Sequence, residues 1–268
     1  MAGWNNVGFI WRVVSGDLSM IGIFDSGLGG IPVWEEIKKL NPSEDYVYVA
    51  DHGHLPYGNK SRDYIVSRSR KITEFLIDNG AKTIVVACNS ATTMAIDELR
   101  GSYKNVVFVG VEPALKPASL MGKGTKVLIL GTEATLKSDK FSRGLIKYGK
   151  DLEIVMFSVP VWVEQVEAGL IGDWMEIPGE LKELINKAEV VVLACTHYIF
   201  YAKLLRETYP SKLIIEPSKA VAQRVNSVVK SKGGTGKRRF VSTGEESKVG
   251  MGAARLLVRR VKVEFRSI

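Results

Sequence analysis

Cysteine and histidine are scarce in this chain of 268 residues, which contains two cysteines and three histidines. Neither a Cys-x-x-Cys pair nor a His-Glu-x-x-His motif occurs, so we expect no metal site. No apolar run approaches the roughly 20 residues of a membrane-spanning helix, so we expect no membrane partner. Residues 1–19 lack the basic start and continuous apolar core of a signal peptide. We therefore expect a cytoplasmic protein with reduced thiols, in which residues 1–19 are an N-terminal extension.

The net charge of +8 is concentrated near the carboxyl terminus, because residues 230–268 contain eleven lysines or arginines and three acidic residues. A solvated basic segment is the simplest interpretation of such a run. Binding to nucleic acid or to an anionic membrane surface is the alternative. The basic residues lack the interleaved aromatic residues that bind single strands, and we expect no nucleic-acid partner.

Short apolar runs alternate along the chain with stretches whose apolar residues recur at helical spacing. The predicted strands are Ile21–Phe24, Asp45–Ala50, Thr83–Ala87, Val106–Val111, Val127–Leu130, Glu153–Val159, Glu189–Ala194, Leu213–Ile215, Arg239–Ser242 and Val261–Phe265. The predicted helices are Val33–Leu40, Ser61–Asn79, Thr92–Leu99, Leu136–Tyr148, Trp162–Ala168, Pro178–Lys187, Ala220–Val229 and Glu246–Val258. This alternation predicts an α/β fold with parallel sheets joined by helical crossovers.

The two cysteines occur in two versions of one local phrase. Residues 84–90 read IVVACNS, and residues 191–197 read VVLACTH. Each phrase predicts a buried strand that carries a thiol at its carboxyl end, where polar side chains begin. Cys88 and Cys195 are 107 residues apart, and the strand pattern restarts near Lys126, 106 residues after Met20. The sequence thus indicates an internal duplication that brings two equivalent thiols to one cleft.

Two thiols that face one substrate suit the removal of a proton from one face of a carbon and its return to the other face. A thiol with a pKa near 8.5 can act as acid or as base at little cost. Asp25, His197 and Glu167 are candidate partners, since each falls at or near the end of a predicted element. Contact with one carbon from both sides predicts sulfur atoms roughly 7 Å apart, without a disulfide bond.

Hydroxyl and amide side chains follow the predicted strands where an anionic substrate would need hydrogen-bond donors. Backbone N–H groups at helix starts add to this preference for an anion. The candidates are Ser26, Asn89, Ser90, Thr132, Thr135 and Thr196.

Each of these features also has a simpler structural interpretation. A buried cysteine is usually a small apolar residue, and Asp25 could merely cap a helix. The glycines after Asp25 do not form a GxGxxG or Walker motif, so a turn without nucleotide is favoured. Solvent-facing loop positions are the default for His52 and His54, and Glu167 could belong to a surface helix.

Five motifs, taken in order, resemble the glutamate racemase family, which belongs to the cofactor-independent aspartate/glutamate racemases. These motifs are Phe24–Gly30, Pro56–Gly58, Ala87–Thr92, Gly110–Pro113 and Cys195–Tyr198. The resemblance implies two pseudo-symmetric flavodoxin-like lobes with the active site between them. It implies interconversion of L- and D-glutamate without pyridoxal phosphate or another cofactor, D-glutamate for peptidoglycan, and a homodimer. We expect a first lobe of residues 20–113 plus 217–268 and a second lobe of residues 114–216.

The resemblance also assigns roles to particular positions. Cys88 and Cys195 would be the catalytic acid and base, assisted by Asp25, Glu167 and His197. The glutamate pocket would be lined by Asp25, Ser26, Pro56, Tyr57, Gly58, Asn89, Ser90, Thr132, Thr135, Thr196 and His197. This sequence departs from the family pattern at Ser90, where threonine is frequent, and at residues 199–200, where Ile-Phe replaces Pro-Leu.

Other functions stay open at this point. A racemase for aspartate or a related amino acid differs from a glutamate racemase only in pocket depth. A thiol hydrolase using Cys195 and His197 is a different class, although neighbouring positions at a strand end point apart and Cys88 would then be idle. A binding protein that uses the basic terminal segment is a third possibility.

Overall fold

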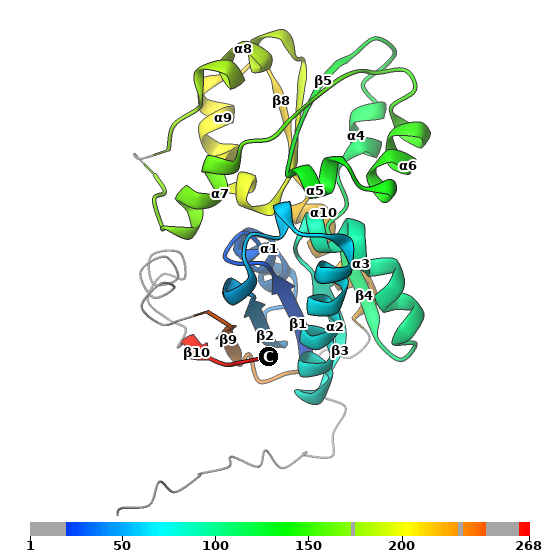
Figure 1. Cartoon of the computed structure of the whole chain (residues 1–268), viewed down its shortest axis with the longest axis vertical. Coiled ribbons are helices and arrows are strands. Elements are labelled where there is room, and N and C mark those ends of the chain that lie inside the picture. Colours follow the sequence, from blue (N-terminus) through cyan, green and yellow to red (C-terminus); the bar gives the residue numbers. More distant parts are fainter. Residues whose placement is uncertain (1–19, 173–174, 230–232, 245–262) are drawn as a thin grey trace, which may run out of the picture.

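The computed structural model describes residues 20–172, 175–229, 233–244 and 263–268. The predicted extension at residues 1–19 and the predicted helix Glu246–Val258 lie outside these residues. The described residues form two parallel sheets, and helices cover each sheet in a separate lobe (Figure 1). The predicted α/β class with parallel sheets is confirmed. No helix in the described part of the chain is both long and apolar enough to cross a bilayer.

The first sheet has the strand order β10-β9-β2-β1-β3-β4. Its strands are β1 (Met20–Asp25), β2 (Asp45–Ala50), β3 (Ala81–Val86), β4 (Val107–Gly110), β9 (Arg238–Ser242) and β10 (Val263–Phe265). The C-terminal strands therefore return to the first sheet, where β9 pairs with β2 from Tyr46 opposite Arg238 to Ala50 opposite Ser242.

The second sheet has the order β6-β5-β7-β8. Its strands are β5 (Lys126–Gly131), β6 (Glu153–Phe157), β7 (Val190–Ala194) and β8 (Leu213–Ile215). The order β2-β1-β3-β4 in the first sheet matches the order β6-β5-β7-β8 in the second sheet. In each sheet the first strand lies between the second and the third, and the fourth lies beside the third. This repeated order is what the two matching cysteine phrases predict.

Helices connect and cover these strands on both faces, as expected for parallel sheets. The α-helices are α1 (Ile31–Leu40), α2 (Arg62–Asp78), α3 (Asn89–Ser102), α4 (Leu115–Ser119), α5 (Glu133–Leu136), α6 (Asp139–Tyr148), α7 (Pro160–Glu167), α8 (Gly179–Lys187), α9 (Ala202–Thr208) and α10 (Ser218–Val228). Short 3₁₀ helices are η1 (His52–His54), η2 (Tyr57–Asn59) and η3 (Thr196–Tyr201).

The alternation of side chains along β1 shows how the first lobe is filled. Ile21 and Ile23 pack on one face with Trp34 of α1, while Phe24 packs on the other face with Ile72 of α2. All of these side chains are buried, so the sheet is enclosed between two apolar layers. Rigid strands therefore carry the polar residues that begin where each strand ends.

Several helix boundaries differ from the sequence-based prediction, and the helices α4 and α9 were not predicted. Two of these differences concern α3, α5 and α6. The stretch predicted as one helix, Leu136–Tyr148, is divided into α5 and α6, because Ser138 caps a new helix by accepting a hydrogen bond from Phe141 N–H (3.2 Å). Helix α3 begins at Asn89 rather than at Thr92, directly after the extended Cys88. Asn89 and Ser90 consequently lie in the first turn of a helix, beside the thiol.

Candidate active site

The two cysteines occupy equivalent places in the two lobes. Cys88 follows β3 and precedes α3, and Cys195 follows β7 and precedes η3. Both are buried free thiols, with exposed fractions of 5% and 4%. Each thiol stands at the carboxyl end of a central parallel strand, which is where α/β folds bind ligands.

One cavity between the lobes contains both thiols. Its lining residues are Ser26, Pro56, Tyr57, Gly58, Cys88, Asn89, Ser90, Thr132, Val163, Cys195, Thr196 and His197. All but Val163 are residues that the motifs or the family resemblance assigned to the site, whereas Asp25, which was also assigned to the pocket, does not line this cavity. Thr135 lies just behind this lining, where its hydroxyl is 3.1 Å from that of Thr132 and 3.4 Å from that of Ser90. The structure thus brings residues from both halves of the chain to one enclosed space.

Hydrogen bonds close this space from both lobes. The Thr196 hydroxyl of the second lobe donates to Asp25 Oδ2 of the first (3.1 Å), and the Ser90 hydroxyl lies 2.9 Å from that of Thr132. Asp25 also accepts a hydrogen bond from Gly27 N–H (2.9 Å). These contacts hold a carboxylate and several hydroxyl groups at fixed positions around the cavity.

A chain of polar contacts extends from Cys195. Its Sγ lies 3.9 Å from His197 Nδ1, and His197 Nε2 lies 2.6 Å from Glu167 Oε1. The expectation that a Cys-x-His pair points apart is wrong here, because strand alternation separates adjacent residues and leaves residues two apart on the same face. Cys195 is still extended, and the helix η3 begins directly after it.

Glu167 and His197 form a buried ion pair. Burial alone would raise the pKa of Glu167, but hydrogen bonds from His197 and His52 outweigh it and lower this pKa to about 2. Burial alone would lower the pKa of His197, but its contacts with Cys195 and Glu167 raise this pKa well above 6.5. At neutral pH the site therefore holds an imidazolium beside Cys195.

Cys88 has a different environment. Its thiol lies 4.0 Å from the Ser26 hydroxyl. Burial, followed by the nearby charge of Asp25, raises the pKa of Cys88 to about 12. Burial also raises the pKa of Asp25 itself. The protonated thiol is consequently the resting form of Cys88, and it can donate a proton.

The glycines after β1 allow the backbone to approach these side chains. A Cβ atom at Gly29 would lie 2.4 Å from His197 Nδ1, and one at Gly27 would lie 2.1 Å from Glu167 Oε1. Any larger residue would displace the ion pair, so this turn needs glycine for close packing rather than for a nucleotide phosphate.

Two interpretations from the sequence need correction. Glu167 is not on a solvent-facing helix surface, since its side chain is 13% exposed and also accepts a hydrogen bond from Leu28 N–H (2.7 Å). His52 is not a solvent-facing loop residue, since its side chain is 8% exposed and its Nε2 lies 3.1 Å from Glu167 Oε2. The residues next to His52 in the sequence do not indicate that it is buried, because its partner Glu167 is 115 residues away.

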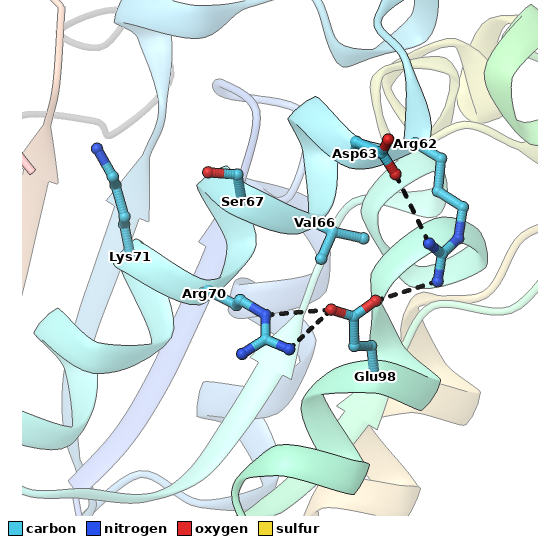
Figure 2. A pocket seen from close by; sticks show the side chains of 7 residues that line it. All are labelled: Arg62, Asp63, Val66, Ser67, Arg70, Lys71 and Glu98. Carbon is cyan, nitrogen blue, oxygen red and sulfur yellow. Dashed lines mark hydrogen bonds and ion pairs between the residues drawn. The ribbon is translucent and has the colours of Figure 1, made fainter.

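A second depression lies on helices α2 and α3, and it contains neither thiol (Figure 2). Glu98 accepts hydrogen bonds there from Arg70 Nη2 (2.7 Å) and Arg62 Nη2 (3.1 Å). These opposite charges satisfy one another on an open surface.

The fold and the cavity define a class of protein with two parallel α/β lobes, each of which contributes one thiol to a shared cleft. The chain matches the family model of the Asp/Glu/hydantoin racemases over residues 35–225, and it belongs to this family. A glutamate racemase of Methylococcus capsulatus is 40% identical to it over 230 residues, which cover 82% of this chain and 83% of that protein.

Solved structures of glutamate racemases have the same fold. The enzyme of Thermus thermophilus in complex with beta-chloro-D-alanine gives a TM-score of 0.76 at 29% identity, and the match covers 94% of this chain and 98% of that one. Escherichia coli glutamate racemase in complex with L-glutamate and the activator UDP-MurNAc-ala gives a TM-score of 0.77 at 26% identity, with coverage of 92% and 98%.

Proposed function

We propose that this protein is a glutamate racemase that moves the α-proton of glutamate between Cys88 and Cys195 without a cofactor. The observation that carries the proposal is the presence of two free, buried thiols, one from each lobe, in a single cavity. The relatives that match most of this chain are themselves named glutamate racemases. One of them has been solved with L-glutamate.

The proposed chemistry uses the two thiols in opposite protonation states. One thiolate takes the α-proton and becomes a thiol, while the other thiol gives its proton to the opposite face of the carbanion and becomes a thiolate. After this exchange the thiol and the thiolate have changed places, and this form of the site binds the opposite enantiomer. Each cysteine is therefore the base in one direction and the acid in the other. Asp25 lies on the Cys88 side and His197 on the Cys195 side, and each assists the nearer thiol.

Polar groups of the cavity would hold the substrate. The hydroxyls of Ser90 and Thr132, together with backbone N–H groups at the start of α3, are donors for the substrate carboxylates, whereas the Thr196 hydroxyl donates to Asp25. The Asn89 amide donates to Val111 O (3.0 Å), while its Oδ1 is buried without a hydrogen-bond partner. We assign this oxygen to the substrate ammonium group, which would satisfy it.

We also propose the remaining features that the family resemblance implies. The protein acts in the cytoplasm as a homodimer and supplies D-glutamate for peptidoglycan, and thus for the cell wall and cell shape. Its two structural units are residues 20–113 with 217–268 and residues 114–216. The membership of the described strands in the two sheets supports this division.

The proposal is tested by incubating the protein with L-glutamate in D₂O without added cofactor. We expect loss of the circular dichroism signal of L-glutamate together with deuterium at the α-carbon, measured by proton NMR. Either Cys88→Ala or Cys195→Ala should abolish racemisation, because each removes one of the two proton carriers. Parallel assays with L-aspartate show whether the protein racemises this shorter amino acid as well as glutamate. Absence of α-proton exchange in the wild-type protein contradicts the proposal.

A thiol hydrolase is the second candidate, and the contact of 3.9 Å between Cys195 and His197 favours it. The same variants separate the two functions. A hydrolase that uses Cys195 tolerates Cys88→Ala, whereas the racemase does not.

A further inference from the structure

Glu167 binds a second histidine that the proposed reaction does not use. Its Oε1 faces His197 Nε2 (2.6 Å), while its Oε2 faces His52 Nε2 (3.1 Å). The other ring nitrogen of His52, Nδ1, lies 2.9 Å from the Ser242 hydroxyl. His52 does not line the cavity, so it acts only through Glu167.

The four side chains in this series of hydrogen bonds come from separate parts of the fold. They are His52, Ser242, Glu167 and His197. His52 begins η1 after β2, and Ser242 ends β9, so both belong to the first lobe. Glu167 ends α7 and His197 lies in η3, so both belong to the second lobe. The contact between His52 and Glu167 therefore joins the lobes, and Glu167 in turn contacts His197 beside Cys195.

The hydrogen bonds have a consistent direction. An ionised carboxylate only accepts hydrogen bonds, so both histidines donate their Nε2–H groups to Glu167. His52 Nδ1 can then accept the proton of the Ser242 hydroxyl, whose oxygen accepts a hydrogen bond from Gly244 N–H (3.1 Å). Glu167 thus selects the tautomer of His52 that donates to it, and the Ser242 hydroxyl can satisfy the other ring nitrogen.

We propose that His52 is a positioning residue, which holds the Glu167 carboxylate so that His197 keeps its proton and its orientation beside Cys195. This inference rests on the proposed racemase function and adds a residue to it. His52 governs the proton transfer at Cys195 and not the transfer at Cys88. The titratable groups around Glu167 are His197 and Cys195 from the second lobe, and His52, Asp25 and Tyr48 from the first.

His52→Ala should lower kcat roughly tenfold or more, because the carboxylate loses a charge-assisted hydrogen bond. The KM for glutamate should stay within about twofold, because His52 does not line the pocket. His52→Gln retains an N–H donor, and we expect it to recover most of the activity. His54→Ala is a matched control in the same short helix, since its partner Asp51 keeps Arg68, Tyr57 and Thr243.

Isotope effects distinguish positioning from general damage. The equilibrium constant of a racemase is one, so a variant changes kcat/KM equally in both directions. The primary effect of deuterium at the α-carbon, however, reports one proton abstraction for each enantiomer. In His52→Ala it should rise for the enantiomer that Cys195 deprotonates and fall toward one for the other enantiomer. His197→Asn identifies that enantiomer, since it perturbs the same thiol.

The coupling can also be measured without turnover. The chain has three histidines, so ¹⁵N-histidine NMR signals are assignable by single substitutions. The NMR signal of the ring N–H that His197 donates to Glu167 should shift in His52→Ala and be retained in His52→Gln. An unchanged His197 signal in His52→Ala overturns the inference whether or not the protein racemises glutamate.

Two kinetic results also overturn it. One is an active wild-type protein whose His52→Ala variant keeps full kcat. The other is a uniform loss of activity with unchanged isotope effects for both enantiomers. A wild-type protein without α-proton exchange contradicts the proposed function instead, and the NMR experiment then decides the role of His52.

Discussion

Glu167 allows a quantitative test of the buried ion pair through the dependence of stability on pH. Its carboxylate is bound by two histidines, and its pKa falls from 4.5 to about 2 although burial acts in the opposite direction. A group with a lower pKa in the folded state stabilises the fold above its unfolded pKa. This stabilisation is therefore complete above about pH 5 and is lost as the pH falls through about 2.

The shift in the pKa of Glu167 predicts how much this carboxylate stabilises the folded protein. It corresponds to about 3 kcal/mol of unfolding free energy near pH 6, and to about half of that near pH 3. Glu167→Gln removes the charge, so the variant should be less stable than the wild type by about these amounts. His197 acts with the opposite sign, because its raised pKa stabilises the fold at low pH and is lost only as the pH rises through the folded value.

Urea unfolding followed by circular dichroism at about pH 6, 4 and 3 measures this difference. Glu133→Gln is a matched control in the same lobe, since Glu133 pairs with Lys137 on an exposed surface. We expect the control to follow the wild-type curve. A stability difference for Glu167→Gln that is constant across this range would refute the assignment of a buried, ionised Glu167.

Two further substitutions test the packing around the site. Gly29→Ala places a methyl group where His197 Nδ1 lies 2.4 Å away, so kcat should fall by about 100-fold, while Gly179→Ala, with open space around its Cβ, should leave kcat unchanged; kcat within twofold of wild type for Gly29→Ala would contradict the close approach. Arg68→Ala removes the guanidinium that binds Asp51 through Nε (3.0 Å) and Nη2 (2.8 Å) and leaves Tyr57 and Thr243 as donors. Loss of this guanidinium from the buried carboxylate should cost about 3 kcal/mol in urea unfolding. A loss below about 1 kcal/mol would show that Asp51 does not depend on this pair.

The identity of the site residues was accessible from the sequence. The residues after β3 and β7, Cys88–Ser90 and Cys195–Thr196, follow apolar runs that must be buried strands. The carboxyl ends of such strands meet ligands in parallel α/β folds, so local pattern and fold class together predict this part of the cavity lining. Pro56–Gly58 were assigned to the pocket by the family resemblance alone. Val163 was missed, because nothing in the sequence around it distinguishes a lining position on α7 from a core position.

Partners across the lobes were not accessible in the same way. His52 has an ordinary loop sequence around it, and only the docking of α7 against η1 places it beside Glu167. The division into α5 and α6 was accessible in principle, since Ser138 followed by Asp139 is a helix-start signal. Local capping can be read from neighbours along the chain, whereas a contact between distant residues cannot.

The sequence by itself determined the two strand-borne thiols, the α/β alternation and the glycine turn after the first strand, because these depend on residues that are neighbours in the chain. The tertiary structure decided that Glu167 joins His197 to His52, and that β9 pairs with β2 in the first sheet. The contact of Glu167 with His52 and the pairing of β9 with β2 join residues more than a hundred positions apart, and packing over such a separation leaves no periodic trace in the sequence.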